Sequence, residues 1–223
     1  MRPSKPASVL LSLVLALLVL SFSISVPILF RPFYYVQIDA LHLQEQTGWS
    51  AEVIREAYDE VLDFCVFGAP FGTGQLAWSE SGRSHFADVR GLFLRDFAVL
   101  GVTAAAAAGF LLLYKAKGLR FHRFAGRGPA FWAGTGAAAA VLVVAGLAAL
   151  DFDRAFVVFH AIFFPGKDNW IFDPATDQII LVMPEVFFRN CALLIGGVLL
   201  ACCAGLILWD LLVHRRSRTA ALR

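Results

Sequence analysis

Four apolar runs, each about as long as a bilayer is thick, constrain this chain more than any other feature. A helix needs about 20 mostly apolar residues to cross a membrane, and charged residues are excluded from its middle. Only 16% of the chain is charged, against about a quarter in a soluble domain. We therefore predict an all-α fold, a polytopic bundle of four transmembrane helices at residues 7–30, 97–114, 129–150 and 190–213.

The first run admits a second interpretation, a cleavable signal peptide. Basic residues precede it and small residues lie near its end (Arg2, Lys5; Ser21, Ser23, Ser25). However, the apolar run continues to Phe30 and meets the aromatic cluster of Phe33, Tyr34 and Tyr35, which is typical of an interfacial belt. We expect the first helix to be retained.

The basic residues predict the orientation of the bundle. They precede the first span, fill the link between spans two and three, and follow span four (Arg2, Lys5; Lys115, Lys117, Arg120, Arg123, Arg127; Arg215, Arg216, Arg218, Arg223). The positive-inside rule makes these segments cytoplasmic. A single membrane domain, 1–223, then has cytoplasmic residues 1–6, 115–128 and 214–223 and extracytoplasmic residues 31–96 and 151–189. Of the 17 acidic residues, only Asp210 lies outside the two outer segments.

Stripes of small residues occur at four-residue spacing in spans two and four (Gly101, Ala105, Gly109; Gly197, Ala201, Gly205). Small residues let helix backbones approach closely in lipid. We expect these stripes to pack within one bundle, as in a monomer, in preference to forming a homodimer interface.

The first outer segment predicts two helices. Ser50 is a suitable N-cap for a helix whose apolar residues recur at helical spacing as far as Cys65, and its charged face is interpreted as a solvated face. Residues 68–75 predict a loop. A second helix is expected from near Ser84 into the second span, which places His85 and Asp88 on one face.

The second outer segment begins with a short apolar stretch, Phe156–Phe164. It is too short to span a bilayer and too apolar for water, so we expect an interfacial or re-entrant piece. Residues 166–170 (GKDNW) predict a turn, Asp173-Pro174 predicts a helix start, and Pro184-Glu185 is expected to open the fourth span.

His85 and His160 are the candidate chemical groups, because each lies at the outer edge of a predicted span. Asp88 would favour a cationic His85, and the phenylalanines around His160 would favour its neutral form. Such divergent environments suit an acid and a base. A pair of interfacial histidines without chemistry is the alternative. His42, His122 and His214 lie in polar or basic stretches and are expected to be spectators.

Other chemistries have weaker support in the sequence. No serine or cysteine nucleophile lies beside either histidine, and Cys65 is a weak candidate on an apolar helix face. The four cysteines form no CxxC pair, which excludes the usual zinc spacing. A metal site built from His85, Asp88 and His160 stays open, although residues this far apart give no spacing signal. No basic patch indicates nucleic acid.

Two segments carry a resemblance to a known family: SHFADVRGLF before span two and FHAIFFPGKDNWIFDPATDQIILVMPEVFF before span four. Together with the four-span layout they resemble the bacterial lipoprotein intramolecular transacylases, long grouped as an uncharacterised integral membrane family. The resemblance covers most of the chain in layout and is specific in these two segments.

The resemblance implies an acyltransferase of the bacterial cell membrane that needs no cofactor. Its members move the sn-2 acyl chain of a diacylglyceryl lipoprotein to the α-amine of the N-terminal cysteine, which gives the lyso form. The family's two essential histidines would be His85 and His160. We expect Asp88 to orient His85, and the candidates for substrate binding are Asn169, Arg90 and Arg154.

The expected partners are the lipoprotein substrate and membrane lipids, with acyl chains lying between the spans, and no nucleic acid. Two alternatives stay open from the sequence. One is a membrane protein without enzymatic activity that binds a lipid or partner through its outer segments. The other is a metal-dependent membrane hydrolase.

Overall fold

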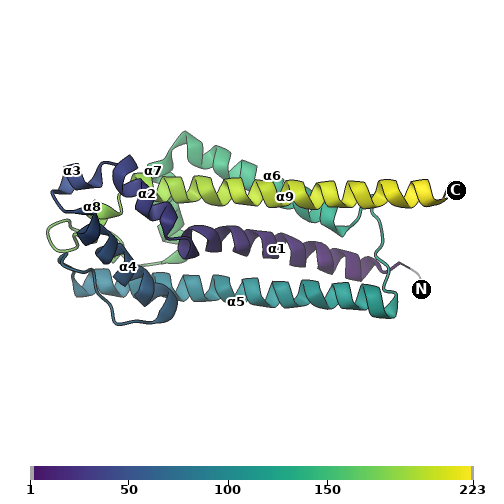
Figure 1. The fold of residues 1–223 in the computed structure, drawn as a ribbon, viewed down its shortest axis with the longest axis horizontal. Coiled ribbons are helices and arrows are strands. Elements are labelled where there is room, and N and C mark those ends of the chain that lie inside the picture. The colour runs from purple at the N-terminus through teal and green to yellow at the C-terminus, as the bar shows by residue number, and fades with distance from the viewer. Residues whose placement is uncertain (1–2, 222–223) are drawn as a thin grey trace. The chain divides into compact units, whose positions relative to one another are not determined.

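The computed structural model of the chain describes residues 3–221, with side chains as far as Val213. Arg2 and Arg223 lie outside the described residues. Every regular element within this range is a helix, which confirms the predicted all-α class (Figure 1). The helices are α1 (Lys5–Leu29), α2 (Pro32–Ala40), α3 (Leu43–Thr47), α4 (Ala51–Phe67), α5 (Glu80–Lys117), α6 (Pro129–Leu150), α7 (Phe152–Phe163), α8 (Ile179–Val182) and α9 (Glu185–Ala221).

The chain divides into two compact units. Unit 1 consists of Met1–Ile24, Phe97–Gly146 and Ile195–Arg223, and unit 2 consists of Ser25–Asp96 and Leu147–Leu194. Helices α1, α5, α6 and α9 contribute residues to both units. All six residues predicted for the site belong to unit 2.

Four helices are long and apolar enough to cross a membrane: Lys5–Leu29, Glu80–Lys117, Pro129–Leu150 and Glu185–Val213. The number agrees with the four predicted spans. Helix α5 has 38 residues and is therefore about 57 Å long, well beyond the ~30 Å of a hydrocarbon core. Its apolar stretch, residues 97–114, is long enough to span, and the charged first part of the helix, residues 80–96, precedes that stretch.

Unit 1 is held by close packing of α1, α6 and α9. Val19, Leu199 and Cys203 form its buried cluster. Gly134 brings α6 so near α9 that an added Cβ would lie 2.7 Å from the Cys203 carbonyl oxygen. The prediction that the small-residue stripes of spans two and four pack within the bundle was wrong. A Cβ at Gly101, Gly109, Gly197 or Gly205 would meet no atom within 4 Å. Four-residue spacing marks one helix face but does not reveal which partner covers it.

Asp210, the one acidic residue outside the two outer segments, has a structural role in unit 1. It is buried on α9, accepts a hydrogen bond from Gly128 N at 3.0 Å and pairs with Arg123 Nη2 at 3.0 Å. The carboxylate thereby ties the link between α5 and α6 to α9. A lone acid among basic residues is thus satisfied by both a charge and a backbone donor.

The core of unit 2 is built around stacked aromatic rings. Tyr34 of α2 and Tyr58 of α4 stack with ring centroids 3.7 Å apart, and Phe187 meets both edge-on. The Tyr34 hydroxyl donates to the Val182 carbonyl at 2.7 Å, which joins α8 to this core. The interfacial belt predicted for Tyr34 was therefore wrong, because its ring is only 1% exposed and packs against protein.

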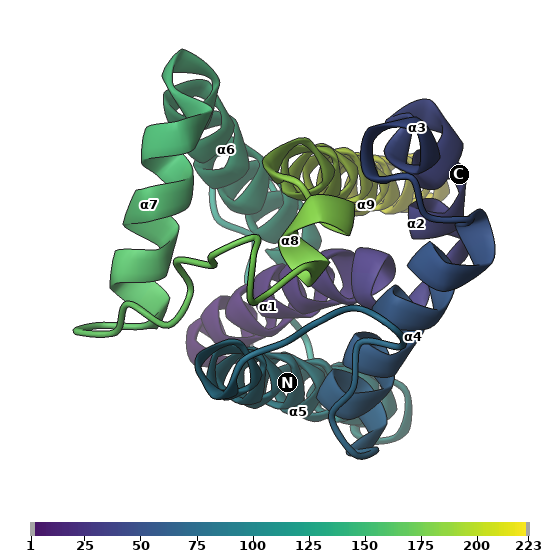
Figure 2. The same cartoon turned by 90° about the vertical axis from the view of Figure 1, so that its left-hand side faces the viewer.

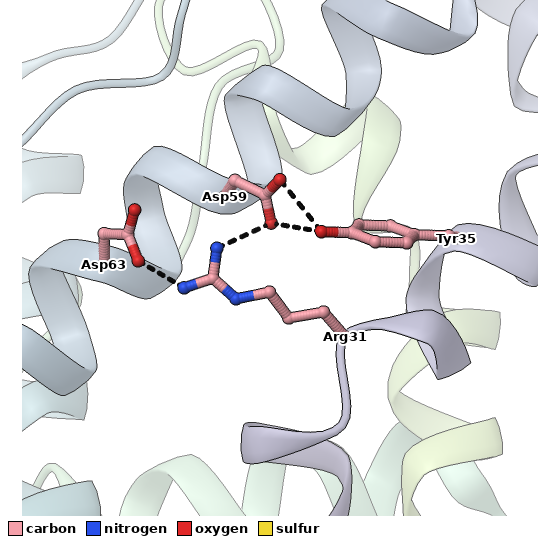
Figure 3. Close-up of polar contacts among 4 residues, drawn as sticks. All are labelled: Arg31, Tyr35, Asp59 and Asp63. Atoms are coloured by element: carbon pink, nitrogen blue, oxygen red, sulfur yellow. Dashed lines mark hydrogen bonds and ion pairs between the residues drawn. The ribbon is translucent and has the colours of Figure 1, made fainter.

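The charged face of α4 is not merely solvated. Arg31 donates to Asp59 at 2.9 Å and to Asp63, and the Tyr35 hydroxyl donates to Asp59 (Figure 3). Glu60 accepts from Gly74 N at 2.7 Å and so fastens the loop after α4. The helix begins as predicted, with Ser50 Oγ accepting from Val53 N. Its acids hold the neighbouring backbone and α2 in place.

Helix α7 is the short apolar piece predicted after span three, and Asp151 caps it by accepting from Arg154 N at 2.9 Å. Figure 2 shows α7 apart from α2, α3 and α4, with an irregular segment leading from it to α8. The helix start predicted at Asp173-Pro174 was wrong. Asp173 instead closes a turn, accepting from Ala175 N through its side chain and from Asp177 N through its carbonyl.

Candidate active site

His85 reaches the site from the beginning of α5. Helix α5 starts after Ser79, whose hydroxyl accepts from Gly82 N at 3.0 Å and so caps the first turn. This places His85 in the second turn, where its side chain is 7% exposed. A polar imidazole is thus buried in the part of α5 that precedes its long apolar stretch.

His160 reaches the site from α7, on the face opposite the exposed apolar side chains of that helix. It is 6% exposed, whereas Phe159 and Phe163 are about half exposed. Its Nδ1 atom lies 2.8 Å from the Phe156 carbonyl oxygen, one helical turn earlier. A carbonyl oxygen can only accept, so Nδ1 carries a proton, and in the neutral ring Nε2 keeps its lone pair.

The structure brings the two predicted histidines together. Their ring centroids are 5.8 Å apart, and Phe164 contacts both rings, at 5.0 Å from His85 and 5.7 Å from His160. Other aromatic rings complete the enclosure: Phe172 lies 5.5 Å from His85, and Trp170 stacks on His160 at 4.4 Å. We call this group of rings the aromatic enclosure. Within it, His85 is 7% exposed and His160 is 6% exposed.

A chain of polar side chains approaches His85 from the segment after α7. Lys167 Nζ donates to Asp88 Oδ1 at 2.5 Å, and Asn169 Nδ2 donates to Asp88 Oδ2 at 3.1 Å. Asp88 itself makes no hydrogen bond to His85. Among the described residues, only His85 Nδ1 and Asn169 Oδ1 are buried side-chain nitrogen or oxygen atoms without a hydrogen-bond partner.

Burial sets the protonation states of these groups. It lowers the pKa of His85 to about 4, with a further lowering from His160, although Asp88 opposes the shift. Burial also lowers the pKa of His160. Burial alone would raise the pKa of Asp88, but its bonds to Lys167 and Asn169 outweigh it and lower that pKa. At neutral pH the site therefore holds two uncharged imidazoles beside an ionised aspartate.

The chain matches the family described as lipoprotein intramolecular transacylase Lit over residues 9–188. The chain belongs to this family. It is therefore an acyltransferase that modifies lipoproteins, and its four apolar helices fit an integral membrane protein. A comparison with curated proteins gave no significant match.

Solved structures of the membrane integral lipoprotein intramolecular transacylase Lit from Bacillus cereus share the fold. One has 23% identity and a TM-score of 0.84, with 96% of each chain covered. A variant of it in which a histidine is replaced by arginine has 23% identity and a TM-score of 0.78, with 96% of this chain and 93% of that chain covered. A histidine-to-alanine variant has 24% identity and a TM-score of 0.74, with 94% of each chain covered.

The remaining predicted site residues of this transacylase lie in different surroundings. The Arg90 guanidinium donates to the Phe64 carbonyl at 2.7 Å and packs against the end of α4 at Gly68. Arg154 is exposed on α7. Of the predicted spectators, His42 is exposed and lies 3.4 Å from Glu45. The side chain of His214 is beyond the described ones.

Sequence reasoning missed Lys167 and the aromatic enclosure. Apart from the substrate-binding candidate Asn169, GKDNW was predicted only as a turn, although it brings Lys167 and Asn169 to Asp88 and Trp170 to His160. The available signal was a lysine, an amide and a tryptophan within four residues of an otherwise apolar segment. Such a cluster after an interfacial helix merits attention as a site.

Two alternative chemistries lose support from this geometry. Among the described side chains, no three histidine, cysteine or acidic groups are arranged to hold a metal ion, so the geometry gives no support to a ligand set of His85, Asp88 and His160. Cys65 is buried, and burial raises the pKa of its thiol to about 12. A thiol with such a pKa is a poor nucleophile at neutral pH.

Proposed function

We propose that this transacylase moves the sn-2 acyl chain of a diacylglyceryl lipoprotein to the α-amine of its N-terminal cysteine, giving the lyso form. The observation that carries the proposal is the pair of buried imidazoles, 5.8 Å apart in a shared aromatic enclosure, in a chain of this family. Both rings are near enough to act on a single ester.

The substrate requires two proton transfers. An α-ammonium has a pKa of about 7.7–8.0, so it must lose one proton before its nitrogen can attack the ester carbonyl. As the C–N bond forms, the nitrogen gives up a second proton, and the glycerol oxygen takes one when the C–O bond breaks. Two neutral imidazoles supply this chemistry: one accepts the first proton and releases it to water, and the other carries the second to the glycerol oxygen.

His160 is prepared for the role of a base. Its Nδ1 proton is committed to the Phe156 carbonyl, which leaves the Nε2 lone pair for the substrate. Trp170 stacks on the ring and fixes its plane. The bond to Phe156 favours His160 as the acceptor of the amine proton.

Asn169 is proposed to orient His85. Its amide nitrogen faces Asp88, so Oδ1 is the free end of the amide, and the side chain is close enough to influence the pKa of His85. An amide oxygen accepts, so it would take the proton of His85 Nδ1 in a hydrogen bond. Each of the two unpartnered atoms then gains a partner. Asp88 therefore acts on His85 through Asn169, in place of the direct contact expected from the sequence.

Much of the rate advantage comes from the substrate itself. Ester and amine belong to one molecule, and oriented intramolecular reactions reach effective molarities of about 10⁵ M or more. The protein then has to manage protons and keep water away from the intermediate. Of the residues predicted to bind substrate, Arg154 is free to meet a lipid headgroup, whereas Arg90 is occupied at the end of α4.

The decisive experiment uses a bacterium whose lipoproteins carry a free diacylglyceryl cysteine. Expression of the wild-type chain should move one acyl group from glycerol to the amine, as read by mass spectrometry of an N-terminal lipopeptide. The double variant His85→Gln, His160→Gln, present in the membrane at an equal level, should leave the peptide unchanged. An unmodified lipopeptide in the wild-type strain would contradict the proposal.

We also propose that both termini are cytoplasmic and that the site faces outside the cell membrane. The basic residues of the chain support this orientation. A membrane-impermeant amine reagent on intact cells should then label Lys167, which is about half exposed, and spare Lys115 and Lys117. The reverse labelling pattern would overturn the orientation.

A further inference from the structure

We propose that Asp177 is a positioning residue for acyl transfer. Its carboxylate joins the start of α5, which carries His85, to the segment that carries Asn169 and Trp170. This inference rests on the proposed two-histidine site. Neither the family match nor the sequence pattern assigns a role to Asp177.

Asp177 is a buried carboxylate satisfied by hydrogen bonds. It is 4% exposed. Its Oδ1 accepts from Ser79 N at 2.8 Å, and its Oδ2 accepts from Ser79 Oγ at 2.7 Å and from Thr176 Oγ1 at 3.1 Å. No ion pair among the described side chains includes it. A buried charge is costly, so three donors converging on one carboxylate indicate a junction that the fold maintains.

The neighbouring residues strengthen the same junction. Ala77 N donates to Gln178 Oε1 at 2.8 Å, and Gln178 N donates to the Ala77 carbonyl at 3.0 Å. Gly82 lies against the carboxylate, and a Cβ there would collide with Asp177 Oδ1. Glycine costs up to about 1 kcal/mol relative to alanine inside a helix, so the close approach explains its presence. We call these contacts the Asp177 clamp.

The Asp177 clamp lies next to the site on both of the chain segments that it joins. On one side, Ser79 is the N-cap of α5, and His85 follows in the second turn of the same helix. On the other side, Asp177 follows the irregular segment with Asn169 and Trp170 by a few residues. A shift at the clamp therefore moves these two side chains relative to His85. Misplacement by about 1 Å can cost roughly 10²-fold in rate.

The test compares Asp177→Ala, Asp177→Asn and Gly82→Ala with a matched control, Asp59→Asn, all in the full-length protein in proteoliposomes. Asp59 is also a hydrogen-bonded carboxylate of unit 2, but it holds Arg31 and Tyr35, far along the chain from the site (Figure 3). The substrate is a synthetic diacylglyceryl lipopeptide. Readouts are kcat and KM, the melting temperature, and the titration of His85 by NMR of labelled histidines, assigned with His85→Gln.

We expect Asp177→Ala to lower kcat by roughly 10²-fold with a smaller change in KM, because positioning acts on the bound substrate. Gly82→Ala should lower kcat in the same way, since it forces the clamp apart with the carboxylate present. Asp177→Asn keeps an acceptor for Ser79 N and should fall between. The His85 titration should move to higher pH in Asp177→Ala as water enters, and Asp59→Asn should leave kcat and this titration unchanged.

Three results would overturn the proposal. The first is wild-type kcat in folded Asp177→Ala. The second is an equal loss of kcat in Asp177→Ala and Asp59→Asn that follows the loss of melting temperature, which indicates a merely structural role. The third is an unmoved His85 titration. If the wild-type protein transfers no acyl group, the proposed function fails, and the titration still decides whether the clamp positions the site.

Discussion

The two imidazoles differ in what satisfies their Nδ1 atoms. His160 donates to a backbone carbonyl of its own helix, whereas His85 Nδ1 has no partner and faces a site in which Asn169 Oδ1 also has none. The first arrangement is fixed locally by α7. The second depends on the segment that carries Asn169, about 80 positions further along the chain. At this scale, His160 is the more firmly oriented group and His85 the more easily disturbed one.

Replacing either histidine tests the proton transfers directly. We expect His85→Gln and His160→Gln each to lower the single-turnover rate by roughly 10²- to 10⁴-fold, the usual contribution of a general acid or base. The rate is measured with a diacylglyceryl lipopeptide in proteoliposomes. His42→Gln serves as the control and should retain the wild-type rate. A His160→Gln protein with full activity would remove that ring from the mechanism.

The positive charge of Lys167 is predicted to lower the pKa of His85. Lys167 lowers the pKa of His85 and also pairs with Asp88, which acts in the opposite direction. Lys167→Met removes the positive charge that lowers the pKa of His85, and it leaves the Asp88 carboxylate without its cation. Both effects raise the pKa of His85. Burial, the largest cause, persists and keeps that pKa below 6.5. NMR titration of His85 should show this rise, and an unchanged or lower pKa would contradict the electrostatic role.

Helix α7 combines an exposed apolar face with a buried imidazole. It is short, and its first turn depends on the Asp151 cap. Such a helix draws its stability from packing and from the cap, because isolated helices of this length are marginal in water. At this scale the cap supports the geometry of His160 without touching the substrate.

Removing the cap should therefore loosen α7. We expect Asp151→Ala to destabilise the helix by about 1 kcal/mol, the usual effect of losing an aspartate N-cap. Hydrogen exchange should accelerate at the amides of α7. Ser50→Ala, which removes the cap of α4, is the matched control and should accelerate exchange in α4 only. Unaltered protection of α7 in Asp151→Ala would show that packing alone holds this helix.

The sequence predicted the elements better than their contacts. The Ser50 cap, the loop after α4 and the start of α9 at Glu185 follow local rules of spacing and capping, and all were found. The pairing of His85 with His160 was expected from the spans and the resemblance. The roles of Lys167 and Trp170 depend on how a long irregular segment folds back on α5. Local patterns carry no information about such a return, and the same limit explains the misread glycine stripes.

For the molecule as a whole, the residues proposed for the site all fall in unit 2, whereas the buried cluster of unit 1 consists of small and apolar side chains. The one buried acid of unit 1, Asp210, has its cation and donor. Unit 2 instead contains two buried imidazoles and a buried carboxylate, Asp177, whose charge no cation balances among the described residues. Its stability should therefore be the more sensitive of the two to pH.

Acid should destabilise the folded protein through these histidines. The pKa of His85 is about 4 when folded and 6.5 ordinarily, so between these values the unfolded state binds more protons. Stability is complete above pH 6.5 and falls as the pH drops, by up to about 1.4 kcal/mol per pH unit for this group. The melting temperature in detergent should decline from pH 6.5 to about 4. His85→Gln should flatten the decline, and an equally steep curve would exclude His85 as its source.

The bond between His160 and the Phe156 carbonyl has a consequence for the surrounding lipid. The carbonyl belongs to the turn of α7 on which the imidazole stands, so the ring keeps its tautomer only while that turn stays wound. If a thinner lipid leaflet or a harsh detergent frays this turn, the Nδ1 proton of His160 loses its hydrogen bond to the Phe156 carbonyl. The enzyme would then lose its activity although every side chain of the site is still present.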